Sequence, residues 1–335
     1  MAQHGAMGSE TGGHGERSQA IPTAVRLFLG IDGGQSSTSA LIGDESGKVL
    51  GGGTGGPCNH AAAGEGAERL RCAITESVSG ACAQAGLAQT ARFAVACCGM
   101  SGGPDDKRVI LEELLPADRV ILATDAEIAL AGATTTGRGI IVIAGTGSIA
   151  FGRNAAGATA RVGGWGYLFG DEGSAYDMVR QALRAALRVE EGWGPRTALR
   201  QTLLEASGAK TANDCLHLFY TPEWPRDRIA GLAPLVDAAA VSGDETAREV
   251  LQYAALQLAT LAASVQRRLW HRGEAVEVAF SGGVFESRAV RERFQELVQL
   301  EPETRCGPAK HNAAEGALLE AWRVGSVAIR GEWLE

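Results

Sequence analysis

The chain has 335 residues, 45% of them hydrophobic, which is long enough for two domains of ordinary size that each bury a core. Its 31 basic and 39 acidic residues give a formal net charge of -8, and lysine and arginine form no block anywhere. This balance argues against nucleic acid or an anionic membrane as the main partner.

The cysteines and the apolar segments indicate the cellular compartment in which the protein is expected. Seven cysteines occur without a C-x-x-C pair or a metal-ligand spacing, so neither a disulfide framework nor a zinc site is predicted. No apolar run approaches the roughly 20 residues that span a bilayer, and the N-terminus lacks the apolar stretch of a secretory signal. We therefore expect a soluble protein of the reducing cytoplasm.

Strand and helix patterns predict an α/β first domain over residues 25–135. It follows a tail at 1–24 that has too few large apolar residues to order and is expected to be disordered. In chain order we expect strands at 25–31, 39–43 and 48–50, a helix at 65–85, a strand at 93–97, a helix at 107–115, a strand at 119–123 and a helix at 126–133.

A second domain is predicted over residues 136–335, and it opens as the first does, with a buried strand that ends at a glycine turn. Ser174, with Asp177 three residues on, predicts a capping box at the start of a helix that runs to about Arg188. The later elements expected are a helix at 245–270, a strand at 276–280 and helices at 288–297 and 311–322. The last helix, about 312–325, is compatible with a return to the first domain. Because the pattern restarts, we predict an α/β fold with two similar halves.

Three glycine turns each follow an apolar strand and offer backbone amides that can converge on phosphate oxygens. They comprise Gly33, Gly34, Ser36 and Thr38 in the first turn, Gly145, Thr146, Gly147 and Ser148 in the second, and Gly282 and Gly283 in the third. One such turn is usually only a hairpin, but three in separate strand sets favour phosphate binding. None matches the G-x-x-x-x-G-K-[ST] loop, and no G-x-G-x-x-G opens a helix with an acidic residue at the distance that a dinucleotide site requires.

Two aspartates stand where apolar strands end. An unpaired carboxylate at Asp32 would be costly, so it needs amides, water or a metal nearby. It is equally compatible with a water-mediated ligand of Mg²⁺ beside a nucleotide and with a turn residue that bonds its own backbone. Asp125 lies where a helix is expected to begin. It is compatible with the N-cap of that helix and with a general base that accepts the proton of a substrate hydroxyl in phosphoryl transfer.

The segment 163–174 packs glycines, aromatic residues and two carboxylates between a turn and a capped helix. A tight loop anchored by buried aromatic residues, with Glu172 favouring the helix N-terminus, would account for this composition. Flat apolar surface beside fixed carboxylates is also how proteins hold sugar rings and their hydroxyls.

These motifs resemble those of the N-acetylglucosamine kinases and of the wider family that also holds bacterial glucosamine kinases and BadF/BadG-type activator ATPases. The match covers nearly all of residues 26–325. The resemblance implies two actin-like (ribonuclease H-like) domains with an active-site cleft between them. It implies ATP and Mg²⁺ as cofactors, with phosphate at the first two turns and adenosine at the third. Gln35 departs from the third glycine of many members, and Ser36 replaces the usual threonine.

By the same resemblance, Asp125 is the catalytic base and Asp32 holds Mg²⁺ through water. The residues implied in sugar binding are Asn59, Ser101, Gly102, Thr146, Gly164, Trp165 and Asp171. The expected reaction transfers the γ-phosphoryl group of ATP to the 6-hydroxyl of an amino sugar. N-acetylglucosamine is the first choice, and glucosamine and N-acetylmuramic acid are close substitutes.

Two other functions stay open at this point. An activator ATPase of a dehydratase or reductase would share the nucleotide motifs, but it needs cysteine ligands for a shared iron-sulfur cluster, and 170–172 carries no cysteine. A sugar-responsive regulator would keep the fold without catalysis, although the tail has no basic DNA-reading segment and Asp125 is retained. A monomer and a homodimer are both compatible with the sequence.

Overall fold

The structure is a computed structural model that describes residues 25–34, 36–58, 65–101, 107–134, 136–329 and 331–333. The tail at 1–24 and two of the expected sugar-binding residues, Asn59 and Gly102, lie outside these residues. Among the helices that are described, none combines the length and the apolar character needed to cross a membrane.

The first sheet has five strands in the order β3-β2-β1-β4-β5. They are β1 (Leu27–Gly33), β2 (Thr38–Asp44), β3 (Val49–Gly55), β4 (Val95–Met100) and β5 (Val120–Thr124). β1, β2 and β3 form an antiparallel meander, whereas β4 runs parallel to β1 and β5 runs parallel to β4. Helices cover both faces of this sheet, which explains why β1 as far as Ile31, and the whole of β4, are continuously apolar rather than alternating.

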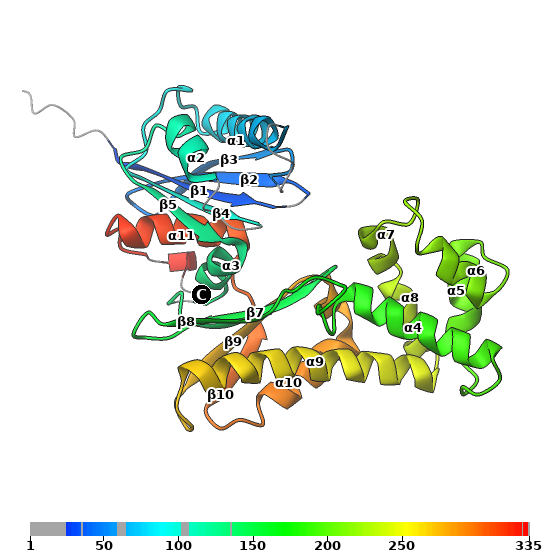
Figure 1. Cartoon of the computed structure of the whole chain (residues 1–335). Helices are drawn as coiled ribbons and strands as arrows, with labels where there is room; N and C mark the ends of the chain where they lie inside the picture. The colour runs from blue at the N-terminus through cyan, green and yellow to red at the C-terminus, as the bar shows by residue number, and fades with distance from the viewer. Residues whose placement is uncertain are drawn as a thin grey trace, which may run out of the picture.

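α1 (Glu65–Gln84) packs on one face of the first sheet, against β2 and β3. α11 (Ala313–Val324), drawn in red in Figure 1, packs on the opposite face against β1 and β4. Its Trp322 is fully buried, and the indole Nε1 donates a hydrogen bond to Asp44 O at 2.9 Å. The end of the chain therefore completes the core around its beginning. The short α2 (Arg108–Leu114) lies between β4 and β5 in the chain.

The second sheet repeats the pairing of the first, in the order β10-β9-β6-β7-β8. Its strands are β6 (Gly139–Ala144), β7 (Ser148–Arg153), β8 (Thr159–Gly163), β9 (Val276–Ser281) and β10 (Thr304–Pro308). β6, β7 and β8 are antiparallel neighbours, and β9 and β10 run parallel to β6. The predicted α/β fold with two similar halves is confirmed, although the sequence analysis did not name β7, β8 or β10 as strands.

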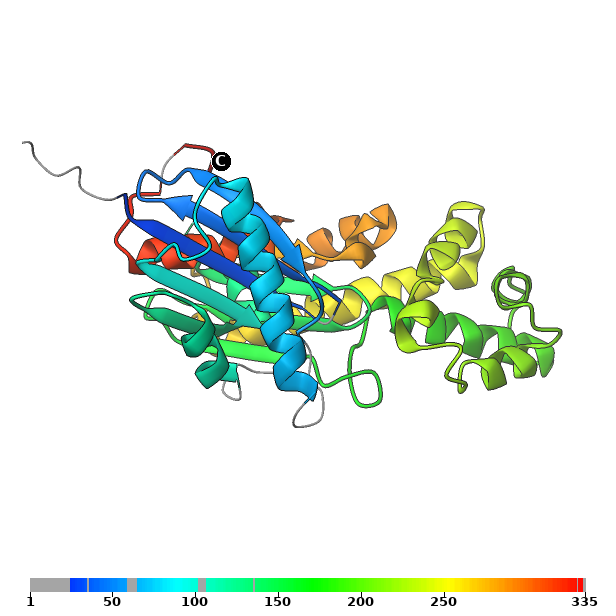
Figure 2. The same cartoon turned by 90° about the horizontal axis from the view of Figure 1, so that it is seen from above.

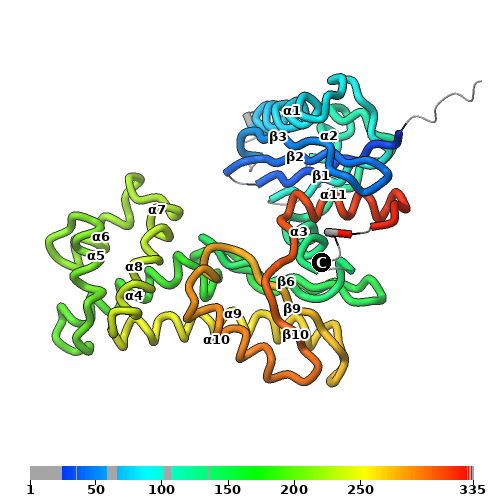
Figure 3. The backbone as a smooth tube through the Cα atoms, turned by 180° about the vertical axis from the view of Figure 1, so that it is seen from behind, coloured from blue at the N-terminus to red at the C-terminus, as the bar shows by residue number. Residues whose placement is uncertain are grey.

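α3 (Asp125–Ala133) lies between the two sheets, as Figures 1 and 3 show from opposite sides. It packs against α11 and against β6, β7 and β9 of the second sheet. On the other face of the second sheet lies α9 (Glu245–Leu269), with α10 (Arg288–Val298) beside it. In α9, Ala254, Leu258, Leu261 and Val265 recur at spacings of three and four and are buried, so they form the face that packs on the core.

A lobe of helices extends from the second sheet, seen at the far end of the molecule in Figure 2. It contains α4 (Ala175–Glu190), α5 (Leu199–Ser207), α6 (Ala212–Leu218), α7 (Arg226–Ala230) and α8 (Ala233–Val241). Of these, the sequence predicted only α4. The others have nine residues or fewer, too short for a periodic apolar stripe to be recognised.

The start of α4 corrects one expectation. Ser174 is the N-cap, and its side chain accepts a hydrogen bond from Asp177 N, as predicted. However, the Asp177 carboxylate accepts from Gly173 N at 2.9 Å and pairs with Arg180 rather than with the N-cap amide. The cap therefore ties the helix to the loop before it.

Candidate active site

Three polar residues meet at the carboxyl edge of the first sheet, where its parallel strands end. Asp32 is the penultimate residue of β1, Ser101 follows β4 and Asp125 follows β5. The Ser101 hydroxyl donates a hydrogen bond to Asp125 Oδ2 at 3.0 Å, and its backbone N donates to Gly33 O at 3.0 Å. Strand pairing thus assembles residues that are far apart in the chain.

Asp32 and Asp125 are close enough to influence each other. Burial and, second, the negative charge of Asp125 raise the pKa of the Asp32 carboxyl from 3.8 to about 6. Within the described part of the chain, this carboxylate accepts no hydrogen bond. The turn-bonding aspartate that the sequence left open is therefore not observed.

Asp125 is not the helix N-cap. Thr124 holds that position and forms a complete capping box with Glu127. Asp125 is the first helical residue, and its side chain is exposed. One carboxylate oxygen, Oδ1, accepts from Ala126 N at 2.8 Å, while Oδ2 is bound by Ser101. The carboxylate is held at a fixed point and faces solvent.

The first glycine turn divides its polar residues between structure and surface. Gly33 pairs with Thr38 in the β1–β2 hairpin, and Gly34 N donates to Ser37 O at 2.9 Å. Thr38 is fully buried and its hydroxyl donates to Gly56 O at 2.7 Å, so this side chain has no proton left for a phosphate. Ser36 is exposed.

The second glycine turn is bound to the loop at 163–174 through Asp171. Ser148 N donates to Asp171 Oδ1 at 3.3 Å, and Ser148 Oγ donates to Glu172 O at 2.7 Å. Arg226 Nη2 donates to Asp171 Oδ2 at 2.5 Å. Asp171 is 4% exposed and has a left-handed backbone, with φ of 61°. The loop is thereby fixed at the edge of the second sheet.

The aromatic residues of this loop face solvent. Trp165 is 73% exposed, and the Arg161 guanidinium lies 5.3 Å from its ring centroid. Phe169 is also exposed, so the alternative of a loop anchored by buried aromatic residues is wrong. Gly164 has φ of 70°, and its carbonyl accepts from Arg161 Nη2 at 2.7 Å.

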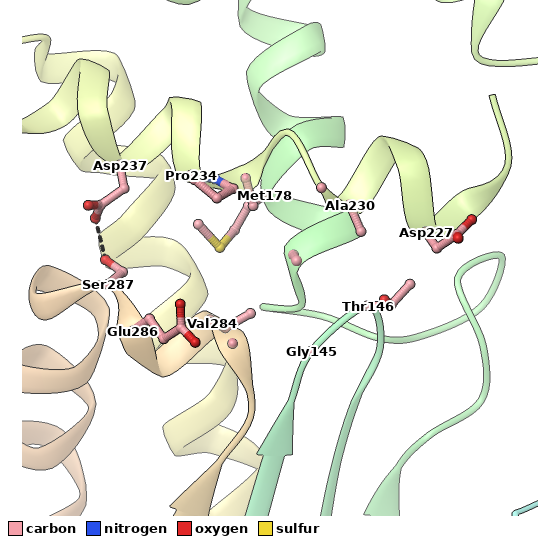
Figure 4. A pocket seen from close by; sticks show the side chains of 14 residues that line it. Gly145, Thr146, Met178, Asp227, Ala230, Pro234, Asp237, Val284, Glu286 and Ser287 are labelled. Atoms are coloured by element: carbon pink, nitrogen blue, oxygen red, sulfur yellow. Dashed lines mark hydrogen bonds between the residues drawn. The ribbon is translucent and has the colours of Figure 1, made fainter. Parts of the chain in front are cut away.

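A cavity of about 540 Å³ opens at the second and third glycine turns, shown in Figure 4. Its floor includes Gly145, Thr146 and Gly283, which follow the carboxyl ends of β6 and β9. Its walls include the apolar Met178, Ala230, Pro234 and Val284 and the acidic Asp227, Asp237 and Glu286. Ser287 donates a hydrogen bond to Asp237 across one end. Such a cavity can bind a ligand whose ring system packs on the apolar walls and whose hydroxyl groups donate hydrogen bonds to the carboxylates.

A family model matches residues 29–321, which is most of the chain, and it describes the BadF/BadG/BcrA/BcrD ATPase family. The chain belongs to this family. The resemblance drawn from the motifs is therefore confirmed.

Relatives in the family and solved structures extend the comparison. The N-acetylmuramic acid/N-acetylglucosamine kinase of Clostridium acetobutylicum is 32% identical over 304 residues, or 89% of this chain and 98% of its own. The N-acetyl-D-glucosamine kinase of Dictyostelium discoideum is 32% identical over 79% of this chain and 87% of its own. A structure from Chromobacterium violaceum, named as a candidate N-acetylglucosamine kinase, is 27% identical with a TM-score of 0.70 and covers 89% of this chain and 99% of its own.

The actin-like fold of the family is shared more widely. The ROK family glucokinase of Streptomyces griseus, solved with glucose and AMPPNP, has a TM-score of 0.52 at 18% identity and covers 89% of this chain and 99% of its own. At that identity the likeness concerns the fold alone. The expected actin-like fold is thus confirmed, and the structural repeat of two five-stranded sheets agrees with it.

The sequence analysis missed several residues of the candidate site. Arg226 and Asp227 lie in α7, and Asp237 lies in α8. Nothing in the local sequence of these short helices indicates that they lie beside the glycine turns. Glu286 and Ser287 lie shortly after Gly282 and Gly283, so their distance from that turn could have indicated them.

Proposed function

We propose that the protein is an ATP-dependent kinase that transfers the γ-phosphoryl group to the 6-hydroxyl of N-acetylglucosamine. Glucosamine and N-acetylmuramic acid are related acceptors to be tested beside it. The observation that carries the proposal is the pair Asp32 and Asp125 at the carboxyl edge of one sheet, combined with a cavity at the glycine turns of the other. Two relatives named for these sugars, each 32% identical, support the substrate class.

The cavity in Figure 4 is proposed as the nucleoside part of the ATP site. Its apolar walls suit a purine, and the carboxylates of Asp237 and Glu286 can accept hydrogen bonds from ribose hydroxyls. The turn at Gly145, Thr146 and Gly147 would then receive phosphate oxygens at its backbone amides. In this orientation the γ-phosphoryl group would point toward Asp32 and Asp125 of the first half.

Asp125 is proposed as the general base. A base for phosphoryl transfer needs one carboxylate within hydrogen-bond reach of the acceptor hydroxyl in the substrate complex. Because Ser101 and Ala126 N hold the Asp125 carboxylate from two sides, its orientation is fixed before any substrate binds. It would accept the proton of the sugar 6-hydroxyl as the new P–O bond forms.

Asp32 is proposed to hold Mg²⁺ through water. A carboxylate whose pKa is raised to about 6, without a hydrogen-bond partner among the described residues, is stabilised by a nearby cation. The described residues contain no cluster of three or more His, Cys, Asp or Glu that could hold a metal by themselves. This donor set fits Mg²⁺, which usually keeps its waters and binds one or two carboxylates plus substrate phosphates. Bound there, the ion would offset charge on the transferring phosphoryl group.

The sugar is proposed to bind between Asp125 and the loop at 163–174. Thr146, Trp165 and Asp171 would contact it from the second sheet, and Ser101 from the first. The exposed indole of Trp165 offers a flat face for a sugar ring. Asn59, Gly102 and Gly164 stay predictions from the motifs, as do a cytoplasmic location and the absence of nucleic-acid partners.

The activator ATPase gains no support from the adjacent cysteines Cys97 and Cys98. Cys97 and Cys98 lie fully buried in β4, and burial raises the pKa of Cys98 to about 12 and that of Cys97 well above its usual value. Thiols bind metals as thiolates, and a cluster shared between chains requires accessible ligands.

A coupled ADP-release assay tests the proposal. Wild type and Asp125→Asn are compared with Mg-ATP and N-acetylglucosamine, glucosamine, N-acetylmuramic acid or glucose. We expect turnover on an N-acetylated amino sugar and a decrease in kcat of about 10²- to 10⁴-fold in the variant, because the general base is lost.

Asp118→Asn is the matched control. Asp118 is exposed and pairs with Arg92, away from the carboxyl edge, so this variant should retain full activity. ATP hydrolysis that no sugar accelerates would contradict the kinase proposal and favour an ATPase or regulator instead. Full turnover by Asp125→Asn would contradict the role of the base alone.

A further inference from the structure

Arg226 makes the closest side-chain contact to the proposed sugar-binding carboxylate. Its Nη2 donates to Asp171 Oδ2 at 2.5 Å, and the guanidinium lies 5.5 Å from the centroid of the Tyr167 ring. Both partners belong to the loop at 163–174, whereas Arg226 begins α7, more than 50 residues later in the chain. We propose that Arg226 is a positioning residue. It fixes the Asp171 carboxylate, and with it the loop at 163–174 (the sugar loop), in the orientation that binds the sugar.

Asp171 needs such a partner because of where it lies. Its side chain is 5% exposed, and a buried carboxylate is unfavourable unless it is paired and hydrogen-bonded. Among the described residues, the other hydrogen bond to its carboxylate is long, 3.3 Å from Ser148 N to Oδ1. The charge-assisted bond from Arg226 is therefore the stronger of the two and determines the direction of Oδ2.

The second glycine turn leaves room for this pair. A methyl group at Gly147 would lie 2.6 Å from Arg226 Nη2 and 2.9 Å from Asp171 Oδ2. Gly147 therefore has a steric role besides any contact with phosphate, since the ion pair fits only against a residue without a side chain. The turn, the loop and α7 meet at this one point.

The same helix also forms a wall of the cavity in Figure 4. Asp227, the next residue after Arg226, lines that cavity together with Ala230 and Gly231. Arg226 thus contacts the sugar loop while its neighbours line the proposed nucleotide site. Movement of α7 would alter both sites, but loss of the Arg226 side chain alone should alter only the sugar side.

This inference rests on the proposed function, because it assumes that Asp171 binds the sugar. It predicts that Arg226→Gln raises the KM for N-acetylglucosamine by about 10- to 100-fold, since a misdirected binding group weakens the productive complex. The affinity for ATP in the absence of sugar should stay within about twofold. Arg226→Lys should recover part of the loss, because it keeps the charge without the fork-shaped guanidinium.

The experiment measures KM and kcat for the sugar with the full chain, and ATP affinity by titration calorimetry. Arg228→Gln is the matched control on the same helix, because the Arg228 guanidinium lies 4.0 Å from the Trp224 ring and donates to Glu223 O instead. Asp171→Asn and the double variant Asp171→Asn/Arg226→Gln complete a cycle. If Arg226 acts through Asp171, the double variant should have a KM within about threefold of Asp171→Asn.

The outcomes separate the inference from the proposed function. A wild type without sugar-dependent turnover would overturn both. A wild-type kinase in which Arg226→Gln leaves the sugar KM unchanged, or adds its full effect to Asp171→Asn, would overturn the positioning role alone. Equal loss of sugar and ATP binding in Arg226→Gln would assign Arg226 to the stability of α7 and would also overturn it. Arg226→Lys keeps the test valid if the glutamine variant fails to fold.

Discussion

At the scale of single residues, Asp32 shows the conflict between a folded core and a reactive site. It is the penultimate residue of a strand whose other residues are almost all buried, yet its carboxylate accepts no hydrogen bond from the described residues. Such uncompensated charge is typical of sites that wait for a ligand. The ligand-free protein should therefore be less stable than one with a neutral group at this position.

This argument gives a pH-dependent prediction for Asp32→Asn. Because the folded pKa is about 6 and the unfolded value is 3.8, the contribution of Asp32 to stability is complete below pH 3.8 and is lost as the pH rises through 6. Between pH 5 and pH 8 the wild type should lose about 1 kcal/mol of unfolding free energy through this group. Asp32→Asn should not lose it, and urea unfolding with EDTA present measures the difference.

Asp118→Asn again serves as the control, since its exposed pair with Arg92 should change this pH dependence little. If the free energy of unfolding changed equally with pH in wild type and Asp32→Asn, the pKa of Asp32 would not be raised by folding. In the kinase assay, Asp32→Asn should be strongly impaired, so that stability and activity change in opposite directions.

At the scale of elements, the contact between α3 and α11 joins the two halves of the protein. α11 begins at a capping box formed by Asn312 and Glu315, and its glycine, Gly316, lies against Gly132 of α3. Glycine allows the two backbones to approach closely. Since α3 begins at Asp125, the spacing of these helices also determines where the proposed base lies.

We predict that Gly316→Ala is destabilising. A methyl group there would lie 1.9 Å from Ile128 O and 2.6 Å from Gly132 N, both backbone atoms that cannot rotate away. Separating the helices should lower the free energy of unfolding by about 1–3 kcal/mol, as overpacking does elsewhere. Urea unfolding measures this loss.

Gly80→Ala in α1 is the comparison. There the nearest atom to a new methyl group is Gly53 Cα at 3.3 Å, and alanine is favoured over glycine in a helix by up to about 1 kcal/mol. This variant should be close to wild type in stability. Equal effects of the two substitutions would indicate that helix propensity, rather than the crossing of α3 and α11, determines the result.

At the scale of the whole molecule, the proposed sugar site is divided between two sheets. Asp125 and Ser101 directly follow strands of the first, and Thr146, Trp165 and Asp171 lie in loops that follow strands of the second. Among the residues that the structure describes, no hydrogen bond joins the two groups. We expect the halves to approach when a sugar binds to both groups, which would also exclude water from the phosphoryl group.

Small-angle X-ray scattering tests this closure. The radius of gyration should decrease when N-acetylglucosamine and a non-hydrolysable ATP analogue are both present, and less with the nucleotide alone. Asp171→Asn, which weakens the sugar contact from the second sheet, should require more sugar for the same change. An unchanged radius with both ligands bound would contradict closure.

The sequence alone indicated the three glycine turns and every strand except β7, β8 and β10, because apolar runs and glycine turns are local signals. It also indicated Asp32, Asp125 and Asp171 through motifs that a family shares. It could not distinguish an N-cap from a base at Asp125, since that depended on Thr124 occupying the cap.

Tertiary structure alone decided which residues surround those motifs. Arg226 and Asp237 lie in short helices without periodicity and reach the site only because α7 and α8 lie beside the loops that follow the strands of the second sheet. Thr38 resembles a phosphate ligand in sequence, but its hydroxyl is bound to Gly56 O within the core. Contacts between distant segments depend on how the whole chain packs, so a short stretch of sequence does not indicate which distant residues it will contact.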